Sequence, residues 1–196
     1  MKRSSALILC ALISIVSFGV AAWYYGQLPA TIPTHWGPDG KPNQWSEKGA
    51  VLFIMPIVIA VMGTLLLALP AMSPKGYKMD RFLPVFNYLM VLVMLMMACM
   101  NGVILYNTAH PYWNGTQWLL SPMFLFIGLI GNLLGKTEKN FFVGIRTPWT
   151  LASDKVWNAT HRLGAKCFVF GGLICTILAV AGLPVLPVTG VFMAFV

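Results

Sequence analysis

Residues 82–135 read FLPVFNYLMVLVMLMMACMNGVILYNTAHPYWNGTQWLLSPMFLFIGLIGNLLG and contain no Asp, Glu, Lys or Arg between Arg81 and Lys136. A helix needs roughly 20 apolar residues to cross the hydrocarbon core of a bilayer. These 54 residues are therefore enough for two crossings, which we expect at about 84–107 and 117–135. The stretch predicts an integral membrane protein built from helices.

Three further charge-free stretches follow Arg3, Lys48 and Lys166 and are 35, 26 and 30 residues long. The corresponding spans are expected at about 5–25, 50–70 and 166–184. Only 9% of the chain is charged, against roughly 25% in a soluble domain, so a water-facing surface cannot be covered. The first stretch is longer than the apolar core of a cleaved signal peptide, which favours an uncleaved first span.

The last apolar stretch, residues 186–196, has only 11 residues and reaches roughly half of the bilayer. Gly182, Pro184 and Pro187 break the helix before it. We expect a shortened sixth helix or a half-span. The predicted fold class is an all-α membrane protein: a bundle of five transmembrane helices, this short C-terminal element, and an amphipathic helix at the cytoplasmic interface.

The basic residues predict the orientation of the chain. They concentrate at the N-terminus and in the connections 71–83 and 136–165, whereas 26–49 has two lysines balanced by two acids and 108–116 has none. Segments rich in Lys and Arg stay in the cytoplasm. We therefore expect a cytoplasmic N-terminus, and 26–49 and 108–116 on the outer side.

The net charge of +8 is explained by these connections, so direct binding of nucleic acid is not predicted. The cysteines lie in or beside apolar spans without CxxC spacing, and we interpret them as small apolar residues rather than as disulfide or zinc ligands. They are Cys10, Cys99, Cys167 and Cys175. No cofactor is predicted.

The outward connection contains LPATIPTHWGPDGKPNQW at 28–45. Its prolines disfavour helix, and Pro38-Asp39-Gly40 is a turn sequence. One interpretation is a compact loop on the outer membrane surface. The other is a binding site for a ligand from outside, with the candidate residues Pro33, His35, Trp36 and Asp39. Pairing of His35 with His110 in a metal site is weakly supported, because helical ligand spacing is absent; a hydrogen-bonding role in the turn is favoured.

The densest polar region is 132–165. Thr147-Pro148 is typical of a helix start, and Ser153-Asp154 is an alternative start. Either one predicts a short amphipathic helix over about 150–163 that lies at the inner headgroups and turns at Gly164 into the last long span.

The candidate ligand- or partner-binding residues here are Asn132, Asn140, Arg146, Thr147, Trp149, Trp157, Thr160, His161 and Arg162. Arg146 and Arg162 are suited to an anionic group such as a lipid phosphate or a peptide carboxylate. Alternatively they contact headgroups non-specifically, or pair with Asp154 and Glu138. His161 is either a proton-transfer group or, as we favour, a structural histidine bonded to Asn132, Thr160 or the backbone.

Two runs, NFFVGIRTPWTL at 140–151 and VWNATHRLG at 156–164, resemble the SdpI family of bacterial membrane immunity proteins. LPATIPTHW at 28–36 is similar to the small uncharacterised domain that precedes that region in the family. The resemblance implies a two-helix unit at 1–70 and an SdpI-like region at 71–196, in the bacterial cytoplasmic membrane. It also implies protection against a secreted peptide toxin and capture of a cytoplasmic transcriptional repressor, with membrane lipid as a further partner and no catalytic residue.

Two other functions stay open. A transporter or flippase for a lipid or peptide would line a polar cavity with Asn132, Asn140, Arg146 and His161, but no charge lies deep in a span. A membrane enzyme acting on a lipid headgroup or peptide is disfavoured, since HExxH, GxSxG and paired carboxylates near the spans are absent from the sequence.

Overall fold

The computed structural model describes residues 1–37, 39, 41–68, 83–111, 116–137, 139 and 143–195. Its helices are α1 (Arg3–Tyr24), α2 (Lys48–Val51), α3 (Ile54–Ala68), α4 (Leu83–Ala109), α5 (Leu120–Leu134), α6 (Pro148–Ala152), α7 (Asp154–Val180) and α8 (Val185–Met193), with a 3-10 turn, η2, at Thr116–Leu119. The strands β1 (Thr31–Trp36) and β2 (Pro42–Glu47) form an antiparallel hairpin.

The five predicted spans are confirmed as helices. Among the described residues, α1, the α2–α3 pair, α4 and α7 are long and apolar enough to cross a membrane. α5 is a shorter apolar helix of 15 residues, and η2 extends it by about one turn. The chain is a multi-pass membrane protein whose lipid-facing surface is the apolar outside of this bundle.

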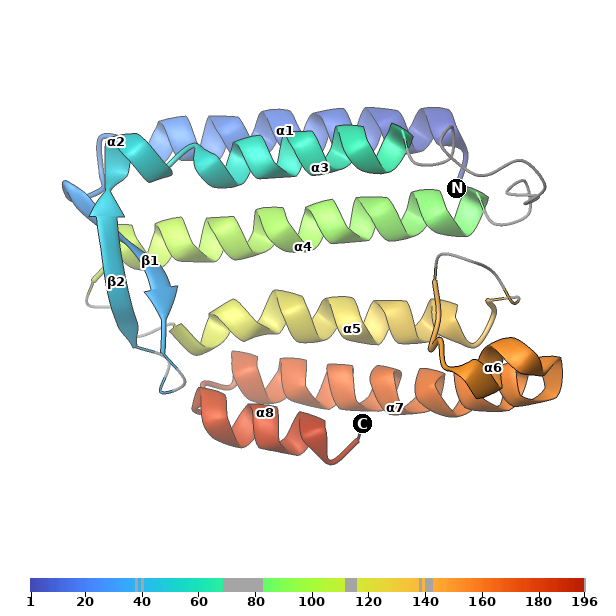
Figure 1. The fold of residues 1–196 in the computed structure, drawn as a ribbon. Coiled ribbons are helices and arrows are strands. Elements are labelled where there is room, and N and C mark those ends of the chain that lie inside the picture. The colour runs from blue at the N-terminus through green and yellow to red at the C-terminus, as the bar shows by residue number, and fades with distance from the viewer. Residues whose placement is uncertain are drawn as a thin grey trace.

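The long helices lie side by side with their axes roughly parallel (Figure 1). α1 packs on α3 and α4, α4 packs on α5, and α5 packs on α7, which α8 covers. Cys10, Ile59 and Met94 form a core among α1, α3 and α4, and Phe124 and Cys175 belong to a second core among α5, α7 and α8. α4 therefore packs against α1 and α3, although it lies after residue 70. The predicted domain boundary at residue 70 stays a prediction.

Glycines bring α5 and α7 into backbone contact. A Cβ added to Gly172 would lie 2.6 Å from the backbone nitrogen of Gly128 and 2.7 Å from the carbonyl oxygen of Phe124. One added to Gly131 would lie 2.8 Å from the backbone nitrogen of Val169. Small residues at such crossings let membrane helices approach closely, where van der Waals packing provides most of the attraction. α5 and α7 therefore form the tightest pair in the described bundle.

The predicted break at Gly164 is wrong, because α7 is one continuous helix from Asp154 to Val180. Both predicted helix starts are used: Thr147 caps α6, and Ser153 caps α7 by accepting a hydrogen bond from the Val156 backbone nitrogen. Glycine costs a helix only about 1 kcal/mol, and α7 contains no proline. At about 40 Å, α7 is longer than the roughly 30 Å hydrocarbon core, so its first turns extend beyond it.

The hairpin was predicted only as a loop. β1 and β2 pair from Thr31 opposite Glu47 to Trp36 opposite Pro42, with register shifts on either side of His35. The Gly37 backbone nitrogen donates to the Lys41 carbonyl (2.8 Å), which closes the turn. A turn was predicted at this place, but its Pro38 and Gly40 lie outside the described residues.

The C-terminal stretch folds back as predicted for a half-span. Gly182 has a φ of +86° and ends α7, while the Leu183 backbone nitrogen donates to the Leu178 carbonyl at 3.1 Å. This αL glycine with a 6→1 hydrogen bond is a Schellman ending. α8 then packs against α7 through Val188, which is fully buried. Its nine residues are too few to cross a bilayer.

Candidate functional site

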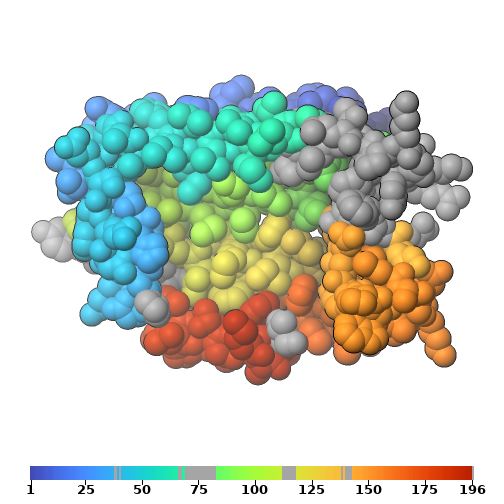
Figure 2. Space-filling model, viewed as in Figure 1, coloured from blue at the N-terminus to red at the C-terminus, as the bar shows by residue number. Residues whose placement is uncertain are grey.

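The two polar regions of the sequence lie at opposite ends of the bundle. We call them the hairpin end, formed by the described residues of 25–55 and the end of α4, and the motif end, formed by the end of α5, the described residues of 135–153 and the start of α7. Figure 2 shows the hairpin covering one end and the segment around α6 forming the other. A side chain of one end therefore cannot share a site with a side chain of the other.

At the motif end, Trp157 and His161 are buried one helical turn apart on α7. Each is 1% exposed, and their rings stack with centroids 3.9 Å apart at an interplanar angle of 19°. The Trp157 indole Nε1 donates to the Thr137 carbonyl oxygen at 2.9 Å. Because Thr137 follows α5, this bond fixes the end of α5 to the start of α7.

Hydrogen bonds define the protonation of His161. Its Nε2 accepts from the backbone nitrogen of Ile145 at 3.0 Å, and its Nδ1 lies 2.8 Å from the carbonyl oxygen of Trp157. A backbone N–H can only donate, so Nε2 carries no proton and the ring proton is on Nδ1. The ring is bonded to the backbone, one of the partners predicted for a structural histidine, while its role in function stays a prediction. Neither ring nitrogen is left for a proton relay.

Gly144 allows the loop to lie on this ring pair. Its φ is +141°, and an added Cβ would lie 2.5 Å from His161 Nε2 and 2.7 Å from Trp157 Cη2. A residue with a side chain is excluded there by both the backbone angle and the space. Gly144 therefore places the Ile145 backbone nitrogen within reach of the imidazole.

Two threonine hydroxyls, of buried Thr150 and half-buried Thr147, complete the loop. The Thr150 hydroxyl donates to the Ile145 carbonyl oxygen at 2.8 Å and accepts from the Thr147 backbone nitrogen at 2.9 Å. The Thr150 backbone nitrogen donates in turn to the Thr147 hydroxyl. This reciprocal pair is a capping box at the start of α6. Thr150 and Thr137 were not in the predicted site; the Thr-x-x-Thr spacing beside Pro148 is the signal that identifies the first.

A pocket of about 230 Å³ opens beside this network and is lined by Gly135, Thr137, Asn158, His161 and Arg162. Arg162 is exposed and its Nε donates to the Asn158 carbonyl oxygen at 3.2 Å. This wall combines a cation with amide and hydroxyl groups, which suits an anionic ligand group.

The predicted charge pairing at the motif end is partly wrong. Asp154 pairs with Lys139 (2.7 Å) rather than with Arg146 or Arg162, and Glu138 lies outside the described residues. Surface pairs of this kind contribute about 0–1 kcal/mol to stability.

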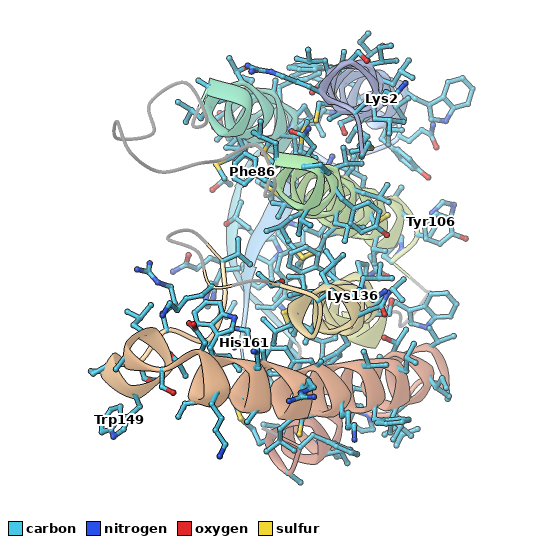
Figure 3. The ribbon with its side chains drawn as sticks, turned by 90° about the vertical axis from the view of Figure 1, so that its right-hand side faces the viewer. Lys2, Phe86, Tyr106, Lys136, Trp149 and His161 are labelled. Carbon is cyan, nitrogen blue, oxygen red and sulfur yellow. The ribbon has the colours of Figure 1, made fainter. Side chains whose placement is uncertain are left out.

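The other predicted residues of this end do not converge on the pocket. Trp149 is 71% exposed on α6 and points away from the bundle, whereas His161 lies between α7 and the loop (Figure 3). Arg146 is exposed, Thr160 is half-buried, and Asn132 is exposed on α5. Asn140 lies outside the described residues.

At the hairpin end, the predicted residues divide between two surfaces. Pro33 and Trp36 line a pocket of about 330 Å³ between the hairpin, α2–α3 and α4. His35 is exposed; its Nδ1 lies 2.6 Å from Asn43 Oδ1 on the facing strand, which confirms a hydrogen-bonding role. Asp39 accepts from the Lys41 backbone nitrogen in the turn (3.1 Å). Among the described residues no cluster of three His, Cys, Asp or Glu is suited to a metal ion.

Lys48 holds the base of the hairpin and was not predicted. Its Nζ donates to the carbonyl oxygens of Tyr25 and Leu28, each at 2.9 Å, and lies 4.8 Å from the centroid of the Tyr25 ring. Its backbone nitrogen donates to the Ala30 carbonyl oxygen. Lys48 thus ties the end of α1 to the start of α2, so the hairpin leaves and re-enters the bundle at a fixed point.

Comparison with known proteins matches each end separately and then the chain as a whole. Residues 136–196 match the SdpI/YfhL protein family, and residues 12–60 match a domain of unknown function, DUF1648. The chain is 30% identical over 172 residues to "Immunity protein SdpI" of Bacillus subtilis (strain 168), which covers 88% of this chain and 80% of that protein. No solved structure matches the chain. The two family matches include the hairpin and the Trp157–His161 pair, and the chain belongs to the SdpI family of membrane immunity proteins.

Proposed function

We propose that this protein protects a bacterial cell against a secreted peptide toxin that acts on its membrane. The observation that carries the proposal is the similarity to an immunity protein over 88% of the chain, together with the separate family matches over residues 12–60 and 136–196. The hairpin end and the motif end both have ordered polar contacts, and an apolar bundle joins them. This arrangement fits a protein that binds a ligand on one side of the membrane and contacts a second partner on the other.

We also propose that the chain lies in the cytoplasmic membrane with its N-terminus and motif end inside. Lys2 and Arg3 follow the initial Met1, and the segment 136–165 carries Lys136, Lys139, Arg146, Lys155 and Arg162. The hairpin has two lysines against Asp39 and Glu47. An excess of Lys and Arg on the same side supports this orientation.

Cysteine labelling tests the orientation with two exposed tryptophans. Trp45 on β2 and Trp149 on α6 are 57% and 71% exposed. We expect Trp45→Cys to react with a membrane-impermeant maleimide in intact cells, and Trp149→Cys to react only after permeabilisation. The unchanged chain is the control for background labelling of the four native cysteines, of which Cys10 and Cys175 are buried. The reverse pattern would show that the hairpin faces the cytoplasm.

In this orientation the hairpin end receives the toxin. Its hairpin is held by Lys48 and by the His35–Asn43 bond, and Pro33 and Trp36 open onto an apolar pocket. An apolar pocket with a few polar groups is the usual form of a small ligand site. The proposed contacts are therefore Pro33 and Trp36 in the pocket, and His35 and Asp39 on the outer face.

The motif end is the proposed contact for a cytoplasmic repressor. Trp149 and Leu151 are exposed on α6, beside exposed Arg146 and Lys155. Trp and Arg are enriched in the residues that contribute most to protein interfaces. Because the first turns of α7 extend beyond the hydrocarbon core, this surface is accessible to a soluble protein as well as to inner-leaflet headgroups.

One challenge experiment tests both roles. Bacillus subtilis 168 lacking SdpI is given this chain and exposed to size-fractionated spent medium of its parent, because a strain that encodes an immunity protein is expected to make the matching toxin. We expect the chain to restore growth to the parental level and to induce a reporter fused to its own promoter. Trp149→Ala should abolish induction but leave growth protected, since Trp149 lies at the end away from the toxin.

The matched control is Trp23→Ala, which removes a comparably exposed tryptophan from α1 and should leave growth and induction unchanged. Sensitive cells at normal protein levels would contradict the protective role. Induction that persists in Trp149→Ala would remove α6 from signalling.

A non-enzymatic role is also part of the proposal. His161, the most deeply buried titratable side chain of the motif end, has both nitrogens occupied by the backbone. Its pocket neighbours, Asn158 and Arg162, can bind an anion, and none of the described residues that line the pocket is a carboxylate that could act as a base. The arrangement supports binding and positioning rather than general acid–base chemistry.

A further inference from the structure

The pocket beneath the hairpin, which we call the hairpin pocket, has one feature that an apolar cavity does not need. Its walls are mostly aliphatic and aromatic, and α4 adds the amide of Asn101. The lining residues are Ile32, Pro33, Thr34, Trp36, Ser46, Val51, Leu52, Ile54, Met55, Asn101, Ile104 and Leu105.

Asn101 is 5% exposed, no side-chain hydrogen bond of it is found among the described residues, and its amide is open to the pocket instead of being enclosed like the Oδ1 of Asn107. A buried amide without a partner is costly, so buried amides are normally bonded. Asn87, on the same helix and 3% exposed, follows that rule by donating to the Met1 carbonyl oxygen at 3.3 Å. The Asn101 amide instead faces a pocket of about 330 Å³, so its partner is expected to come from a ligand.

The chemistry of an amide restricts what that ligand is. Asn offers one carbonyl acceptor and an NH₂ donor side by side, which match the N–H and C=O of a peptide backbone. The walls around it accept apolar side chains. An acyl chain would fill the same walls but offers no donor or acceptor to the amide at that depth.

We propose that the hairpin pocket binds an apolar peptide segment, with Asn101 hydrogen-bonded to the peptide backbone and Trp36, Met55 and Leu105 in contact with its side chains. This inference rests on the proposed function only in identifying the peptide with the toxin. It makes Asn101 a binding residue that selects peptide over lipid in an otherwise lipid-like pocket.

Photo-crosslinking of the full chain in lipid nanodiscs tests the inference. The peptide probe is a capped tetrapeptide of Leu and Val with one photo-leucine, and the lipid probe is a diazirine-labelled palmitate. We expect the peptide to crosslink to the pocket walls, and Asn101→Leu to reduce its capture about tenfold, because the exchange removes the polar contacts. Palmitate capture should be unchanged by Asn101→Leu.

Asn107→Leu is the matched control. Asn107 lies on α4 and its Oδ1 is buried without a partner, but it does not line the pocket, so peptide capture should be retained. Equal capture by Asn101→Leu and native protein, both folded by size-exclusion chromatography, would overturn the inference, as would a parallel loss of palmitate. Capture of the peptide that depends on Asn101 supports peptide binding in the pocket even if the chain does not protect cells. Failure to protect cells would contradict only the proposal that the peptide is the toxin.

Discussion

Replacing Gly172 with leucine is expected to separate α5 from α7 and to destabilise the protein strongly. The first side-chain carbon would already lie 2.6 Å from the Gly128 backbone nitrogen, and 2.7 Å from the Phe124 carbonyl oxygen. Those neighbours are backbone atoms that cannot turn away as a side chain would. Relief therefore requires α7 to move away from α5 as a whole.

The expected loss follows from the contacts that such a movement breaks. Overpacking of a core costs about 1–3 kcal/mol even where side chains can adjust. Here they cannot, so we expect at least about 3 kcal/mol, and a fall in Tm of roughly 6 °C or more in detergent by the scaling for chains of this size. Thermal unfolding of the purified protein, followed by size-exclusion chromatography, measures both.

Gly102→Leu provides the comparison, because a Cβ at Gly102 on α4 has no atom within 4 Å. The same side chain is then added at a glycine of the same bundle without a backbone collision. A Tm for Gly172→Leu equal to that of Gly102→Leu would show that α5 and α7 do not touch at this crossing.

The spans could be predicted because a bilayer imposes one rule on every segment that crosses it. Charge-free stretches such as 82–135 had no other stable location. The glycines were harder to interpret. A glycine at position 164 predicts a break, yet Gly164 continues α7 and lies against the Ile145 side chain. Gly172, inside an apolar run without other signals, lies at the close crossing of α5 and α7.

The hairpin shows the opposite difficulty. Pro33 and Pro42 lie within its strands, and proline lacks a ladder donor, so the composition indicated a loop. Two strands suffice here because the hairpin closes over the ends of the helices, where Ile32 is buried with Leu28 and Leu105. That contact joins residues about 70 positions apart and has no local signal.

The candidate site was recognisable by residue type but not by role. Trp157 and His161 are four residues apart, so one face of a helix was expected, and their stacking follows from that spacing. The partner of His161 is a backbone nitrogen 16 residues away, which no side-chain pattern reveals. Asn101 was missed for the same reason, since a single asparagine in an apolar run becomes notable only when the pocket beside it is seen.

Gly144→Ala is the second exchange with a large expected effect, and it acts on the motif end alone. Alanine at a φ of +141° is strained, and its methyl group would lie 2.5 Å from His161 Nε2 and 2.7 Å from Trp157 Cη2. Strained backbone costs about 1–3 kcal/mol, and displacement of the loop also breaks the Ile145–His161 bond, worth about 1 kcal/mol. We expect a total loss of about 2–4 kcal/mol in the free energy of unfolding.

A double-mutant cycle separates the two causes, because His161→Ala removes the ring that the new methyl group meets. In that background Gly144→Ala should cost less by about 1 kcal/mol or more, and the remainder is the backbone strain together with the contact with the Trp157 ring. Gly102→Ala, at an open position on α4, controls for adding a methyl group to a glycine and should leave stability unchanged or raise it by up to about 1 kcal/mol, because alanine favours a helix more than glycine does. If Gly144→Ala cost the same with and without His161, the loop at Gly144 would not lie against the imidazole, which would contradict this contact at the motif end. If the cost of Gly144→Ala falls when His161 is absent, the imidazole supports the loop that leads into α6. His161 then acts by positioning, through its hydrogen bond to Ile145. It holds in place the α6 surface that is proposed to bind the repressor.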